Sequence, residues 1–152
     1  MSLFLGEGDN LNSIFMDRYS ILFRGYRRDE NKEGLPQYCG IYVVYRCTYN
    51  NENRTVRLIE MLYIGKSTNV KQRICNHTKR DDFIRQLGDG EELCYSYAEV
   101  SKADLDLIEN ALIFAQKPKL NEDLVDVYRY DSAEFILEGQ CALFKYKKFS
   151  IE

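Results

Sequence analysis

The sequence predicts an α+β fold whose main elements follow one another as strand, strand, helix, strand and helix. Three observations lead to this prediction. Two alternating apolar runs flank an Asn-rich gap, a basic amphipathic stretch follows the second run, and a third apolar run leads into a helix-start signal. With 152 residues, 45% of them hydrophobic, the chain has the size of one domain and enough apolar material for a core.

The strands are predicted from alternation and from β-branched and aromatic residues. Residues 40–47 form the first strand and residues 57–66 the second, and residues 48–57 form a loop or the tip of a protruding hairpin. This gap is too short and polar to hold a crossover helix, so the two strands should be antiparallel. Residues 93–100 form the third strand.

The helices are predicted from their start and stop signals. Residues 67–69 are acceptable N-caps for a helix over residues 70–87, in which a break is expected near the Asp81–Asp82 pair. Residues 101–104 form a capping box, and the helix that it starts should run to about Gln116. A proline follows shortly afterwards and prevents the helix from continuing.

The flanks are predicted to be additions to this core. Residues 1–37 form an N-terminal extension, with a helix over Ser13–Phe23. Residues 123–152 form a C-terminal appendage. Its two strand-like runs, residues 134–137 and 142–149, should pair as a β-hairpin that packs on the core.

The charge pattern indicates a local affinity for phosphates. The chain has 21 Lys and Arg against 24 Asp and Glu, which gives a net charge of -3 and argues against a protein that coats nucleic acid. Two stretches, residues 18–28 and 63–80, are nevertheless basic and contain no acid. An acidic protein can still present such a basic face to a nucleic acid.

The cysteines indicate a reducing compartment. There are five, an odd number, and none forms a CxxC pair, so neither a disulfide framework nor a zinc site is predicted. Reduced thiols in the cytoplasm are the simplest interpretation. No apolar stretch approaches the roughly 18 residues of a membrane span, so no membrane association is expected.

Short motifs occur in a defined order along the predicted core. Gly40-Ile41-Tyr42 opens the first strand and Tyr63-Ile64-Gly65 ends the second. They are followed by Arg73 and His77, then Glu109 on the capped helix, then Pro118-Lys119-Leu120-Asn121. This ordered set resembles the GIY-YIG nuclease family.

The resemblance implies a fold and an activity. It implies that residues 38–122 form a GIY-YIG nuclease-like core, a small three-stranded antiparallel sheet flanked by helices. It also implies a metal-dependent endonuclease that hydrolyses phosphodiester bonds, with DNA as the expected substrate. Glu109 would bind Mg²⁺ or Mn²⁺, because family members place a metal-binding Glu on this helix. The gap between the two motifs is longer than is usual in the family.

The same residues suit this chemistry on general grounds. Arg73 and His77 are four residues apart, so on one helix their side chains reach the same place. Arg73 would stabilise the transition state, and His77 would contact phosphate or tune a tyrosine. Tyr42 or Tyr63 would deprotonate the attacking water, because nearby positive charge lowers the pKa of a phenol. Tyr42 is slightly favoured as this base.

Three further polar residues are expected to support the site. Lys66 and Lys71 lie in the basic stretch and would bind phosphate or substrate. Asn121 follows the proline stop and, by the resemblance, supports the site. Each assignment has a structural alternative: tyrosines in strands commonly pack, a Glu at the border of an apolar stripe can pair with a cation, and Asn is favoured in turns.

Two other functions remain open from the sequence. One is a catalytically silent nucleic-acid-binding module with the same fold. The other is a protein-interaction adaptor that uses the acidic residues 122–126 together with Asp131 and Glu134.

Overall fold

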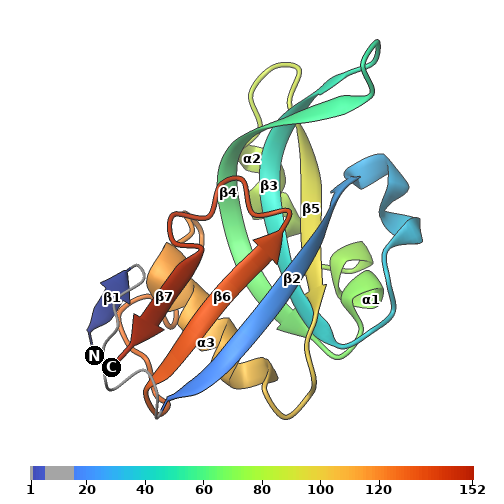
Figure 1. The fold of residues 1–152 in the computed structure, drawn as a ribbon. Coiled ribbons are helices and arrows are strands. Elements are labelled where there is room, and N and C mark those ends of the chain that lie inside the picture. Colours follow the sequence, from blue (N-terminus) through green and yellow to red (C-terminus); the bar gives the residue numbers. More distant parts are fainter. Residues whose placement is uncertain (1, 6–15) are drawn as a thin grey trace.

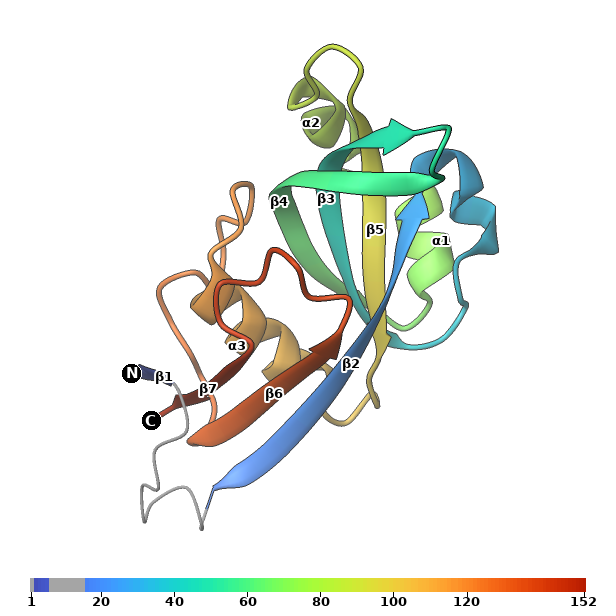
Figure 2. The same ribbon diagram turned by 45° about the horizontal axis from the view of Figure 1, so that its top comes forward.

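The computed structural model describes residues 2–5 and 16–152. In these ranges one mixed sheet of seven strands dominates the fold, in the order β1-β7-β6-β2-β5-β3-β4. The sheet curls like half of a barrel (Figures 1 and 2). The predicted fold class, a small three-stranded antiparallel sheet with flanking helices, is therefore wrong.

The strands and helices have the following bounds. The strands are β1 Leu3–Leu5, β2 Asp17–Arg28, β3 Gly40–Asn50, β4 Thr55–Ser67, β5 Glu92–Glu99, β6 Ala133–Gly139 and β7 Lys148–Ile151. The α-helices are α1 Val70–Cys75, α2 Arg80–Arg85 and α3 Leu105–Gln116, and a 3₁₀ segment, η2, covers Asp29–Gly34. None of the helices in the described ranges is long and apolar enough to cross a membrane.

The correction comes from the flanking segments, which supply four of the strands, β1, β2, β6 and β7. β2 pairs antiparallel with β5 and parallel with β6, while β7 pairs antiparallel with both β6 and β1. The helix expected over Ser13–Phe23 is wrong from Asp17 onward, where the chain is β2. Residues 13–15 lie outside the described ranges. Pairing with β2 covers the edge that β5 would otherwise expose.

Several elements of the central segment are where the sequence places them. β3 and β4 form an antiparallel hairpin, and β5 pairs antiparallel with β3. The hairpin is longer than expected, because its strands reach Asn50 and Thr55 and only residues 51–54 form the turn. The C-terminal pair β6–β7 is antiparallel, but β7 begins at Lys148 rather than near residue 142.

The helices differ from expectation in two details. The chain leaves helical structure between α1 and α2, at residues 76–79, just before the expected break. At the start of α3, the capping box does not form as expected. The N-cap Asp104 makes no side-chain capping bond, and the Ser101 hydroxyl donates to its carboxylate instead.

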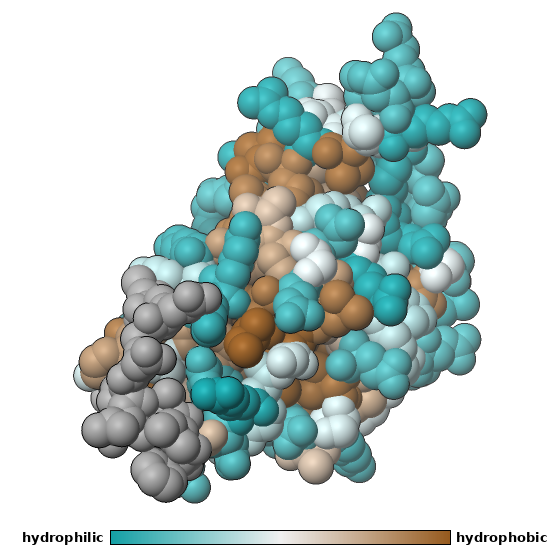
Figure 3. Space-filling view, in the orientation of Figure 1, coloured by the Kyte–Doolittle hydropathy of each residue, from teal (hydrophilic) through white to brown (hydrophobic). Residues whose placement is uncertain are grey.

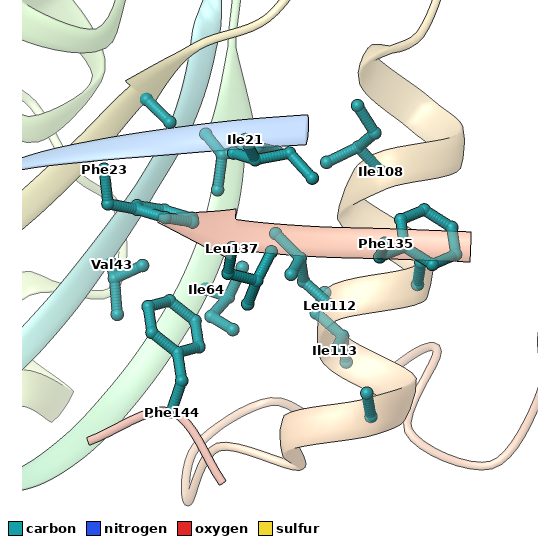
Figure 4. Packing of buried hydrophobic residues seen from close by; sticks show 14 of the residues in the cluster. Ile21, Phe23, Val43, Ile64, Ile108, Leu112, Ile113, Phe135, Leu137 and Phe144 are labelled. Carbon is teal, nitrogen blue, oxygen red and sulfur yellow. The ribbon is translucent and has the colours of Figure 1, made fainter. Parts of the chain in front are cut away.

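The two faces of the sheet are covered by different helices. On the concave face, α3 packs against β2 and β6 in the larger core. Figure 4 shows residues of this core from these elements, among them Ile108, Leu112 and Ile113 of α3 and Ile21, Phe23, Phe135 and Leu137 of the strands. On the other face, α1 and α2 pack on a second core with Tyr42 and Tyr95. The site described next lies at the boundary of this second core.

Candidate active site

The Tyr42 ring lies directly against Gly65, which joins the two motifs in space. The two residues are register partners across β3 and β4. A Cβ atom on Gly65 would lie 2.3 Å from the Tyr42 hydroxyl oxygen and 2.4 Å from Cζ. Only glycine leaves room for the ring at this position, so the glycine of the second motif sets the position of the tyrosine of the first.

Tyr63 and His77 complete an aromatic cluster around Tyr42. The ring centroids of Tyr42 and Tyr63 are 6.3 Å apart, and each lies 5.5 Å from the imidazole centroid. Phe83 of α2 closes the cluster, with its centroid 4.9 Å from His77. The two tyrosines and the histidine are therefore in one place, although the intervening sequence is long.

His77 is held by both ring nitrogens. Its Nε2 is 2.6 Å from the Tyr42 hydroxyl oxygen, and its Nδ1 accepts a hydrogen bond of 3.0 Å from the Lys79 amide. Burial, together with the charges of Arg73 and Lys79, lowers the pKa of His77 to about 4. The ring is therefore neutral near pH 7. Because Nδ1 accepts, the proton is on Nε2, which donates to Tyr42.

The break between α1 and α2 makes this orientation possible. His77 lies in the turn after α1 and not on the helix that carries Arg73, so the expected helical i, i+4 pair is not formed. Asn69 caps α1 by accepting from the Gln72 amide at 3.0 Å. Arg73 lies in the last turn of this helix and still reaches the same phenol as His77.

The Tyr42 oxygen accepts a hydrogen bond from His77, and the Arg73 guanidinium also acts on it. The residue is only 1% exposed, and burial raises the pKa of its hydroxyl more than Arg73 lowers it. Tyr42 is therefore protonated at rest. The two neighbours oppose this rise, because both stabilise a phenolate more than a phenol.

Glu109 of α3 lies at the edge of the same cluster. Its side chain is 14% exposed, and Oε1 is 3.9 Å from the Lys66 ammonium. Burial raises the pKa of Glu109, and a hydrogen bond from the Lys66 backbone amide opposes this rise. The Glu109 charge in turn contributes to raising the pKa of both Tyr63 and Tyr42.

The segment that follows α3 forms hydrogen bonds with the backbone of the edge strand β4. Asn121 accepts from the Ile64 amide at 3.0 Å and donates to the Ile64 carbonyl at 2.9 Å. The Leu120 amide donates to the Leu62 carbonyl at 2.9 Å. Asn121 thus contacts the backbone next to Tyr63 and imitates a neighbouring strand, rather than pointing at the phenols.

The structure separates the two lysines that the sequence assigns to substrate. Lys66 contacts Glu109 and also forms an ion pair with Asp106. Lys71 lies elsewhere, with its ammonium 3.8 Å from a Glu33 carboxylate oxygen. Lys66 is therefore part of the cluster, and Lys71 faces the N-terminal flank.

Sequence reasoning missed the residues that support His77 from behind. The Lys79 amide orients the imidazole, and the Lys79 ammonium lies 5.3 Å from the Tyr63 ring centroid. Arg80 forms a two-pronged ion pair with Asp29, at 2.9 and 2.7 Å, and so ties α2 to η2. Nothing local in the sequence connects Asp29 with Arg80, because the contact depends on where β2 ends.

The donor set around Glu109 is compatible with a hard divalent cation. No group of three or more His, Cys, Asp or Glu side chains that could hold a metal ion occurs within residues 2–5 and 16–152. Mg²⁺ usually keeps several waters and binds through one or two carboxylates together with substrate phosphates. Glu109, a partly desolvated carboxylate with a single distant cation, fits that mode.

The resemblance to GIY-YIG nucleases rests on the motif residues of this chain. Comparisons with protein-family models, with curated proteins and with solved structures found no match.

Proposed function

We propose that this protein is a metal-dependent endonuclease that hydrolyses phosphodiester bonds in DNA. The observation that carries the proposal is the meeting of Tyr42, His77, Arg73 and Glu109, which come from β3, from α1 with the turn after it, and from α3. A partly buried carboxylate such as Glu109, beside a buried phenol and a histidine, is costly to maintain for packing alone. It suits a reaction in which a proton is removed and negative charge develops on phosphate.

Tyr42 acts as the general base of the proposed reaction. Because the Tyr42 hydroxyl is protonated at rest, its proton must first pass to solvent once substrate and cation are bound. The phenolate then takes a proton from water, and the resulting hydroxide attacks phosphorus. The leaving oxygen departs with the bonding electrons and takes a proton from solvent. His77 and Arg73 stabilise the phenolate that accepts this proton. Tyr63 is the weaker candidate, because no side chain of the described residues donates a hydrogen bond to its hydroxyl, whereas His77 donates to Tyr42.

Arg73 and Glu109 have complementary roles. The Arg73 guanidinium lies near the phenol and offers further N–H groups to the phosphate oxygens as charge grows on them. A cation such as Mg²⁺ or Mn²⁺ held by Glu109 would neutralise charge on the phosphodiester when bound. The Lys66 ammonium lowers the carboxyl pKa of Glu109 and so opposes the rise that burial causes.

We place the protein in the cytoplasm. All five cysteines are free thiols, which is compatible with a reducing compartment.

The test is plasmid nicking in Mg²⁺ or Mn²⁺. Glu109→Gln keeps the shape of the side chain and removes its charge, so nicking should disappear while the fold is retained. The control is Glu122→Gln, an exposed acid outside the cluster, which should nick like the wild type. DNA binding without nicking by the wild type would instead support the silent binding module. Normal nicking by Glu109→Gln would reject the assigned metal ligand.

A further inference from the structure

Apart from the candidate active site, a surface with unbalanced positive charge lies between β2 and the projecting end of the β3–β4 hairpin. A groove of about 420 Å³ is formed there, and three of its lining residues are arginines, Arg27, Arg28 and Arg54. Its lining contains no Asp or Glu. Figure 3 shows that the surface of this projecting end is hydrophilic. The groove is therefore basic and open to solvent.

The walls of the groove are held in place. The Arg28 guanidinium of β2 lies 3.5 Å from the centroid of the Tyr49 ring, and this contact connects β2 with the hairpin. The same guanidinium donates to the Glu92 carboxylate of β5 at 3.0 and 2.9 Å. The Arg27 guanidinium packs on Gly34, where a Cβ atom would come within 2.6 Å of it. Both arginines are thus fixed before any ligand arrives, so little side-chain entropy is lost on binding.

Two of the three arginines are not neutralised. Arg28 is paired with Glu30 and Glu92. Within the described part of the chain, neither Arg27 nor Arg54 forms an ion pair with an acid. Arg27 is thus both held in place and without a counter-charge, and Arg54 adds a second unpaired guanidinium from the exposed turn. Guanidinium groups without counter-charges, beside tyrosine rings, are the features that bind the sugar-phosphate backbone of nucleic acids.

The groove is also connected to the candidate active site. Tyr97 lines the groove and is the register partner of Tyr42 across β3 and β5. Arg24, on the next strand, is in turn the register partner of Tyr97. The groove therefore reaches the strand adjacent to the one that carries the proposed base.

We propose that this groove binds the phosphate backbone of the DNA beyond the cleaved bond, with Arg27 and Arg54 as its main contacts. The inference rests on the proposed function for the identity of the ligand. It explains why the β3–β4 hairpin is long: the extension carries Arg54 to a place where it faces Arg27 of β2. The hairpin then acts as an arm for substrate and not as an idle insertion.

The test is the binding of a fluorescein-labelled DNA duplex, measured by fluorescence anisotropy in EDTA so that no cleavage occurs. The groove variant is Arg27→Gln with Arg54→Asn. Asn is chosen because Arg54 has φ 53°, a left-handed conformation that Asn tolerates. The control, Lys102→Gln with Arg129→Gln, removes the same charge from two exposed positions outside the groove. Thermal unfolding checks that both variants are folded.

We expect the groove variant to bind about tenfold or more weakly at low salt, and its salt dependence to fall by about one unit of slope per arginine. The single variant Arg54→Asn, which lies in an exposed turn, should show about half of the change in slope. The control should stay within about twofold of the wild type. Equal affinity and slope for groove and control variants, or no DNA binding by the wild type, would overturn the proposal.

The binding measurement and the nicking assay fail separately. If the wild type nicks but the groove variant binds normally, the groove assignment is wrong and the endonuclease proposal stands. If the groove variant loses binding but the wild type never nicks with either metal, the groove is a DNA site of a protein that does not cleave.

Discussion

The Tyr42 hydroxyl oxygen lies 2.6 Å from Nε2 of His77, and the other nitrogen of this ring accepts from a backbone amide. The backbone contact decides the tautomer of the imidazole, and the tautomer makes His77 a donor to Tyr42. The sequence leaves two roles open for His77, contact with phosphate and tuning of a tyrosine, and in the structure His77 contacts the tyrosine.

Removal of the Tyr42 hydroxyl should abolish activity and also cost stability. Tyr42→Phe removes the proposed base, so nicking should fall by about 10² to 10⁴-fold. The His77 N–H loses its acceptor, so unfolding free energy should fall by about 1 to 3 kcal/mol. The matched control is Tyr45→Phe, a buried phenol that bonds Ser96 at 2.9 Å. It should lose similar stability in denaturant titrations and keep nicking.

A methyl group at Gly65 should displace the Tyr42 ring. Gly65→Ala places a carbon where the hydroxyl oxygen would be only 2.3 Å away. Overpacking of this kind costs about 1 to 3 kcal/mol of unfolding free energy, so the variant should still fold. Its nicking should be largely lost, because the Tyr42 ring moves. Gly88→Ala is the control, because its nearest neighbour is a flexible carboxylate at 3.3 Å. Retained activity in Gly65→Ala would contradict the packing role.

His77 should titrate far below an ordinary histidine. It is the only histidine in the chain, so NMR of the imidazole gives one signal without assignment. Because burial lowers its pKa from 6.5 to about 4, the ring should stay neutral down to about pH 5, with the proton on Nε2. A midpoint near 6.5, or a proton on Nδ1, would reject the arrangement around Tyr42.

The same shift predicts how stability depends on pH. The unfolded chain protonates His77 below about pH 6.5, whereas the folded protein does so only near pH 4, so stability should fall as the pH drops between these values. The loss is on the order of 3 kcal/mol. Urea unfolding of wild type and His77→Gln at several pH values isolates this contribution, because other acids titrate equally in both proteins. Parallel curves for the two proteins would refute it.

Asn121 should matter for the sheet edge more than for chemistry. Asn121→Ala removes both hydrogen bonds to Ile64, which should cost about 1 to 3 kcal/mol. Asn121→Asp keeps the acceptor and loses the donor, so its stability should lie between those of wild type and alanine variant. Denaturant titration measures the order. A fully stable alanine variant with reduced nicking would point instead to contact with substrate.

The sequence by itself determined the local elements of the central segment. Alternation in residues 40–47 and 57–66 was enough to predict the β3–β4 hairpin, because side-chain direction in a strand depends only on position. The proline stop after Gln116 ended α3 as expected. The motif residues Tyr42 and Tyr63 also came together as the order of motifs suggested.

Only the tertiary structure decided the size of the sheet and the exact geometry of the site. The sequence predicts a helix over Ser13–Phe23, but from Asp17 onward pairing with β6 makes this segment a strand. These partners lie far along the chain, and no local pattern records a hydrogen bond to a distant strand. Other features of the site also depend on contacts between residues far apart in the chain. They are the bond of His77 to Tyr42, the contact of Asn121 with Ile64 and the groove beside Arg27. Free energy from burial is gained only when such distant segments meet.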